Sequence, residues 1–98
     1  MPFVRVVIKT STNPKKKLMA VLYDKDNKTK TIHFGSAGMS DFTKNKDEER
    51  KKRYIARHRK RENWTVPDTA GSLARWVLWN KTTRRASIAD YKKRFNSK

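Results

Sequence analysis

A run of basic residues in the middle of the chain limits how this protein can build a core. Eight of the twelve residues from Arg50 to Arg61 are Lys or Arg. A helix over this run has a very narrow apolar stripe, so core burial alone cannot hold it in place. Apolar residues are only 35% of the 98-residue sequence, which is enough for one modest core. We therefore expect a single small basic domain over residues 1–98.

The first third of the chain has the residue pattern of β-strands. Runs rich in β-branched and apolar residues cover 3–10, 18–23 and 29–34. Turn-forming residues separate them, at Asn13-Pro14 and at 24–27. The pattern predicts a three-stranded antiparallel meander within residues 1–35. The segment Gly35–Gly38 lacks the Lys-Ser/Thr of a phosphate-binding loop, which favours a tight strand exit with Gly at positive φ.

Residues 46–95 have the pattern of three helices, after a segment to about Asn45 that we expect to be a loop. The first helix runs from Asp47 to about Arg61, with acidic residues at its start and basic residues later, as the helix dipole favours. The second covers 70–79 after a cap at Asp68 or Thr69, and the third covers 88–95 after a cap at Ser87. The last three residues are expected to fray.

These elements predict an α+β fold in which a small three-stranded antiparallel sheet is followed by three helices. The core is expected to combine alternating strand residues with helix residues at helical spacing. Its predicted members are Val6, Ile8, Leu18, Ala20, Leu22, Ile32, Phe34, Ile55, Leu73, Trp76, Val77, Ile88, Tyr91 and Phe95.

Net charge is the strongest functional signal. The chain has 26 Lys and Arg against 9 Asp and Glu, for a net charge of +17. Such an excess disfavours a compact state unless a partner supplies negative charge, as an acidic protein surface, nucleic acid or an anionic membrane surface does. The expected polyanion-binding residues form one set on the first helix and a second near the C-terminus: Arg50, Lys52, Arg53, Arg57, Lys60, Arg61, and Arg84, Arg85, Lys92, Arg94.

Catalytic and metal sites are not indicated. The two histidines, His33 and His58, lie on different predicted elements, whereas zinc sites usually need three or four ligands. Most carboxylates lie in a turn or at a helix start, where capping explains them. The chain has no cysteine, and its sequence shows no signal peptide and no apolar run long enough to span a membrane. We expect no enzyme activity, no metal, no cofactor and no small-molecule substrate.

Tryptophan serves two expected purposes in this chain. The position of Trp76 beside Leu73 and Val77 favours a place in the core. Trp64 and Trp79 are candidates for anchors at a protein interface, where Trp is enriched.

Three motifs occur in a fixed order between about Lys30 and Phe95. They are IHFGSAGMSDFT with its FGxxGxxD spacing, DEERKKRYIARHRKRENW with its YxxRH spacing, and the Trp-containing DTAGSLARWVLWNK. In this order the chain resembles a family of short, basic, uncharacterised proteins of nucleocytoplasmic large DNA viruses, a group that includes algal and giant viruses. The resemblance implies a virion component, found in the particle and in the host cytoplasm or nucleus during infection, and it supplies no catalytic residues.

Two functions therefore remain open at the level of sequence. The first is a non-catalytic virion-associated structural protein, a minor capsid or core component that binds acidic capsid protein, DNA or membrane. The alternative is a DNA- or RNA-binding protein without sequence specificity, used in viral replication or packaging. A helix-turn-helix reading of residues 47–79 is disfavoured because its second helix is apolar where a reading helix should be polar.

Overall fold

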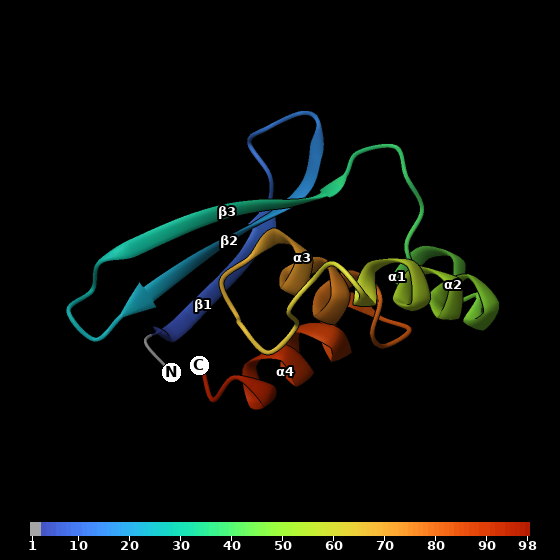
Figure 1. The fold of residues 1–98 in the computed structure, drawn as a ribbon. Coiled ribbons are helices and arrows are strands. Elements are labelled where there is room, and N and C mark those ends of the chain that lie inside the picture. Colours follow the sequence, from blue (N-terminus) through green and yellow to red (C-terminus); the bar gives the residue numbers. More distant parts are fainter. Residues whose placement is uncertain (1–2) are drawn as a thin grey trace.

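A three-stranded sheet with helices against one of its faces forms the protein in a computed structural model that describes residues 3–98 (Figure 1). The sheet comes first in the chain and the helices follow, so the predicted α+β class is confirmed. The elements are β1 (Phe3–Thr10), β2 (Lys16–Asp24), β3 (Thr29–Ser36), α1 (Phe42–Asn45), α2 (Glu48–Arg59), α3 (Ala70–Leu73), the π-helical turn η1 (Ala74–Leu78) and α4 (Arg84–Arg94).

The sheet is the predicted antiparallel meander, with β2 in the centre. Ala20 of β2 lies opposite Ile8 of β1 and Ile32 of β3, so these three side chains share one face. The same alternation places Leu18 and Leu22 toward the helices, and both are buried. The register thus directs one apolar face of a basic chain inward.

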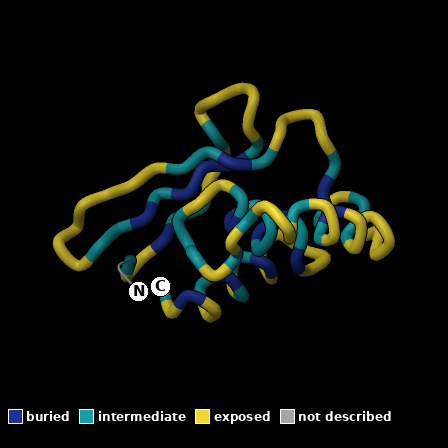
Figure 2. The backbone as a smooth tube through the Cα atoms, viewed as in Figure 1, coloured by how far each residue is buried: buried dark blue, intermediate teal, exposed yellow. Residues whose placement is uncertain are grey.

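The helices close the core from that side. Leu73, Val77 and Leu78 of the α3–η1 segment pack with Tyr91 of α4 and Phe95 just after it against the sheet. The segment was predicted as one regular helix to Trp79, but its second half is π-helical, with the Trp79 amide donating to the carbonyl of Ala74. Buried residues gather between the two layers in Figure 2.

Most of the predicted core is confirmed. Of the fourteen residues, nine are buried, and four more are partly buried against the cluster: Ile8, Ile32, Trp76 and Ile88. The prediction that Ile55 belongs to the core was wrong. Its neighbour Tyr54 is the α2 residue that faces the rest of the protein, with 8% exposure. Phe42, Leu78 and Met19 are buried without having been predicted.

Three local predictions about helices and ends were also wrong. Residues 42–45 form a helical turn because the Asp41 carboxylate accepts a hydrogen bond from the Thr43 amide. The last helix begins at Arg84, with Thr83 as its cap; Ser87 is instead buried, and its hydroxyl accepts from the Lys81 amide at 3.0 Å. The C-terminal residue is not frayed, since Lys98 exchanges backbone hydrogen bonds with Val4 and Val6 of β1.

Glycine is required where β3 leaves the sheet. Gly35 has a φ of 78°, and a Cβ there would lie 2.7 Å from a terminal methyl of the buried Leu78. Gly38 has a φ of 83°, but a Cβ there would meet nothing within 4 Å. The predicted strand exit with Gly at positive φ is confirmed at both positions.

The two glycines form a matched pair for a stability test. Gly38→Ala should cost about 1 kcal/mol, from the left-handed backbone alone. Gly35→Ala should cost about 2–3 kcal/mol, because it adds overpacking against Leu78 to the same backbone cost. Urea unfolding measures both, and equal losses would contradict the close packing of Gly35 on η1.

Candidate polyanion-binding site

The basic helix α2 is stabilised by its own termini. The Asp47 carboxylate caps it by accepting from the amides of Glu49 and Arg50. Glu48 and Glu49 lie in the first turn, and Arg57, His58 and Arg59 in the last. Acidic groups near the N-terminus and basic groups near the C-terminus both interact favourably with the helix dipole, so the sequence can form this helix despite its high positive charge.

The predicted α2 bases lie on the surface without internal neutralisation. All six are exposed. Among residues 3–98, the only one of the six with an acid partner is Lys52, whose Nζ lies 3.8 Å from a Glu49 oxygen. Both of those side chains are more than 70% exposed, so the pair contributes little. Arg50, Arg53, Arg57, Lys60 and Arg61 keep their charge available for another molecule.

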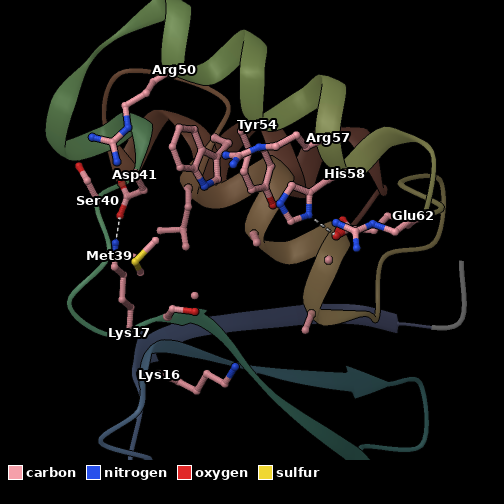
Figure 3. A pocket seen from close by; sticks show the side chains of 18 residues that line it. Lys16, Lys17, Met39, Ser40, Asp41, Arg50, Tyr54, Arg57, His58 and Glu62 are labelled. Carbon is pink, nitrogen blue, oxygen red and sulfur yellow. Dashed lines mark hydrogen bonds and ion pairs between the residues drawn. The ribbon is translucent and has the colours of Figure 1, made fainter.

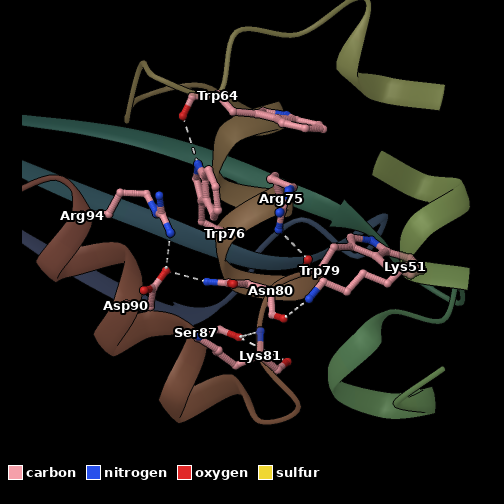
Figure 4. A network of polar contacts seen from close by, with 10 residues as sticks. All are labelled: Lys51, Trp64, Arg75, Trp76, Trp79, Asn80, Lys81, Ser87, Asp90 and Arg94. Atoms are coloured by element: carbon pink, nitrogen blue, oxygen red, sulfur yellow. Dashed lines mark hydrogen bonds and ion pairs between the residues drawn. The ribbon is translucent and has the colours of Figure 1, made fainter. Parts of the chain in front are cut away.

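Aromatic stacking and one lysine attach α2 to the rest of the protein. The Tyr54 ring lies between His58, at a centroid distance of 4.2 Å, and Trp79, at 4.5 Å and nearly parallel. Lys51 lies over the ring of Phe42 and donates to the carbonyl of Asn80 at 2.7 Å (Figure 4). Desolvation by burial lowers the pKa of Lys51. The narrow apolar stripe is therefore supplemented by ring stacking and a hydrogen bond.

A cleft of about 490 Å³ lies between α2 and the end of the sheet. Arg50 and Arg57 border it from α2, and Lys16 borders it from β2 (Figure 3). Arg61 lies on the same border just after the helix. The sequence identified these α2 residues but gave no indication of Lys16, because the strand register and the strand exit bring it to the cleft.

The two carboxylates that line the cleft already have partners within the protein. Asp41, 1% exposed, is paired with Lys17, 11% exposed. Burial acts to raise the pKa of Asp41, but hydrogen bonds from Lys17 and Thr43 outweigh it and hold that pKa below its usual value. Glu62 accepts from Trp64 Nε1 at 2.9 Å and lies 2.8 Å from His58 Nδ1. The cleft border is therefore strongly positive.

Glycine also makes room for one of these acids. A Cβ on Gly71 would lie 2.7 Å from a carboxylate oxygen of Glu62. The absence of a side chain at 71 thus lets Glu62 lie against α3, where it holds His58 and Trp64.

The second predicted basic set is less uniform. Arg84 and Arg85 are exposed, whereas Lys92 is partly buried. Arg94 lies over the Trp76 ring at 3.7 Å and pairs with Asp90 at 3.3 Å. Arg94 therefore has an internal role, whereas Arg84 and Arg85 are exposed and have no acid partner among residues 3–98, as is also true of Lys93.

The two tryptophans predicted as interface anchors take part in internal packing. Trp79 stacks on Tyr54, and Trp64 donates to Glu62 while Arg75 lies 5.4 Å from its ring centroid. Both are partly buried. A role at an interface stays a prediction for each.

Two other expectations can be compared with the described part of the chain. Within residues 3–98, no group of three or more His, Cys, Asp or Glu could hold a metal ion. His33 instead lies within hydrogen-bond distance of the Ser11 hydroxyl, at 2.7 Å. No helix in that range is long and apolar enough to cross a membrane.

A comparison with protein families gives one match. The model of DUF5754, described as a family of unknown function, matches residues 6–58, which is more than half of the chain and extends from β1 into α2. No curated protein and no solved structure matches.

The buried pair beside the cleft should make stability depend on acid. Because the pKa of Asp41 is lowered in the folded state, the stability it contributes is present above the carboxyl's unfolded pKa and is lost as pH falls through the folded value. Asp41→Asn, which can still cap α1, should lower the free energy of unfolding by about 3 kcal/mol at neutral pH. It should also make the free energy of unfolding fall less steeply as the pH is lowered.

Asp68→Asn is the matched control for this prediction. Its partner Lys30 is 53% exposed, so the loss should stay below about 1 kcal/mol. Urea unfolding from pH 7 to pH 3 measures both variants. If Asp41→Asn were no more costly than Asp68→Asn and left the acid limb unchanged, the structural role of this pair would be refuted.

Proposed function

Because the chain belongs to DUF5754, a family of unknown function, we propose a function from its own residues: it is a non-catalytic protein that binds the phosphate backbone of nucleic acid without sequence specificity. The observation that carries this proposal is the row of exposed guanidinium and ammonium groups along α2. Arg50, Arg53, Arg57, Lys60 and Arg61 have no acid partner among residues 3–98.

The length of the row fits a phosphate backbone. At a helical rise of about 1.5 Å per residue, the positions from Arg50 to the end of α2 at Arg59 extend over roughly 14 Å, and Lys60 and Arg61 follow in the turn after the helix. A duplex carries one phosphate charge per about 1.7 Å of its axis with both strands counted, so a row of this length faces several phosphates. Four of the five residues are Arg, whose planar fork can hold phosphate oxygens in pairs.

The segment that follows α2 is not built as a reading helix, which supports binding without sequence specificity. Sequence is read by side chains that reach base edges from a helix or strand placed in a groove. In the segment after α2, Leu73, Val77 and Leu78 are buried against the sheet. That segment is part of the hydrophobic core. The affinity is expected to come from the exposed charges of α2, which contact the phosphate backbone of the nucleic acid.

Salt dependence tests the proposal. If each of the five residues in the row neutralises one phosphate of duplex DNA, log K should fall with log salt at a slope of about −4.5. Arg53→Gln with Arg57→Gln should lower affinity for every sequence alike and make the slope about two units shallower. Fluorescence anisotropy with labelled 20-bp duplexes of two unrelated sequences measures both quantities.

A charge-matched control separates the α2 row from total charge. Lys25→Gln with Lys28→Gln removes the same two charges from the β2–β3 turn, at the end of the sheet away from α2 (Figure 1). These residues are exposed, and the control should change the slope little. Equal effects of the two double variants would contradict a defined site.

Binding to anionic lipid vesicles but not to DNA would show that the partner is a membrane.

We also propose, from the resemblance of the three motifs alone, that this binding serves a virus particle as a capsid or core component. Detection of the protein by mass spectrometry in purified, protease-treated particles would support that place. Its restriction to infected cells would instead favour a role in replication or packaging.

A further inference from the structure

The cleft beside α2 has the shape and chemistry of a binding site that the phosphate row alone does not explain. Its volume of about 490 Å³ lies within the range of roughly 300–1,000 Å³ usual for ligand sites. We propose that it receives one unpaired nucleotide of the bound strand, so that the protein prefers single-stranded to double-stranded nucleic acid. This inference rests on the proposed function, because α2 provides one wall of the cleft.

Positive groups border the cleft from two sides. Arg50, Arg57 and Arg61 come from α2 and its C-terminal end, and Lys16 comes from the start of β2 (Figure 3). All four are exposed, and none has an acid partner among residues 3–98. An anion at the mouth of the cleft would be held chiefly by the arginines of α2, and Lys16 adds positive charge on the sheet side.

The inner surface of the cleft is suited to a base. Small and apolar residues are part of the cleft lining, namely the exposed Met39 and Ala70 and the more buried Gly71, Ala74 and Leu78. Ligand sites typically combine such a lining with a few polar groups that orient the ligand.

The Tyr54 hydroxyl is one such polar group. It makes no hydrogen bond to residues 3–98, and its ring forms part of the cleft lining. A tyrosine hydroxyl is protonated at neutral pH, and burial raises the pKa of Tyr54 further. The hydroxyl can therefore donate to a base or sugar oxygen.

The acids near the cleft do not repel such a ligand strongly. Asp41 is bound by Lys17 and Thr43, and Glu62 is bound by Trp64 beside His58. Lys17 neutralises Asp41, whereas Glu62 keeps its negative charge unless His58 is protonated. Four free basic groups thus face one carboxylate without a cationic partner, and the electrostatics still favour an anionic nucleotide.

Whether a base can enter the cleft depends on whether the nucleic acid is single- or double-stranded. A base held in a duplex is stacked and paired, so it can enter a pocket only after it is extruded, at a cost of a few kcal/mol. A single strand does not carry this cost in full. We therefore expect at least about tenfold tighter binding of a 12-nucleotide single strand than of the matching 12-bp duplex, equivalent to about 1.4 kcal/mol.

A variant that fills the cleft tests the inference. Ala70 is exposed and lies on the cleft lining at the start of α3, so Ala70→Phe should occupy the space without disturbing the core. It should abolish the preference for single strands and leave duplex affinity unchanged. Ala89→Phe, at an exposed position of α4 away from the cleft lining, is the matched control and should keep the preference. Ser36→Trp, at the exposed end of β3 on the cleft lining, is a second filling variant for the case in which Ala70→Phe does not fold.

The outcomes separate this inference from the proposed function. If the wild-type protein binds duplex as tightly as single strand, or if both filling variants keep the preference, the nucleotide site is refuted while backbone binding by α2 stands. If the protein binds neither nucleic acid at about 100 mM salt, both proposals fall. A competing mononucleotide that weakens single-strand binding more than inorganic phosphate does would support a site for the base and the phosphate together.

Discussion

The shortage of carboxylates is the constraint on which the rest of this structure depends. The chain has nine acidic residues for 26 basic ones, and six of the nine hold local structure. They close a turn, cap helices or bind a specific partner: Asp24, Asp41, Asp47, Glu62, Asp68 and Asp90. These roles leave few acids for neutralising α2, so its free positive charge is a consequence of how the fold is stabilised.

The attachment of α2 follows from the same shortage. A helix with so few apolar residues is positioned by contacts that tolerate charge, namely the Tyr54 stack on Trp79 and the Lys51 hydrogen bond to Asn80. The Lys17–Asp41 pair fixes the segment between β3 and α2 from the other side. Together these contacts hold the basic face of α2 beside the end of the sheet, and the cleft is the space between them.

Periodic signals predicted the fold better than they predicted the site. The alternation in β1–β3 fixed the inward residues correctly, because strand side chains repeat every two positions. On α2 so few residues are apolar that the pattern did not distinguish Ile55 from Tyr54, and the difference came from the position of Trp79. The cap at Thr83 competed with an equally suitable Ser87, whose hydroxyl instead binds the linker at Lys81.

Lys16 and Tyr54 meet at the cleft only through tertiary packing. The FGxxGxxD and YxxRH spacings do have local explanations, in the turn glycines and buried Asp41, and in the ring stack beside Arg57.

We propose that this protein meets its polyanion at the unneutralised positive charge of α2. The most direct test of this proposal is a titration of ¹⁵N-labelled protein with a short oligonucleotide, followed through the backbone amides of α2 and the side-chain Nε–Hε signals of its arginines. The signals of Arg50, Arg53, Arg57 and Arg61 are expected to shift first and furthest. Shifts confined to Arg84 and Arg85, or to the sheet face opposite the helices, with α2 unchanged, would contradict the proposal.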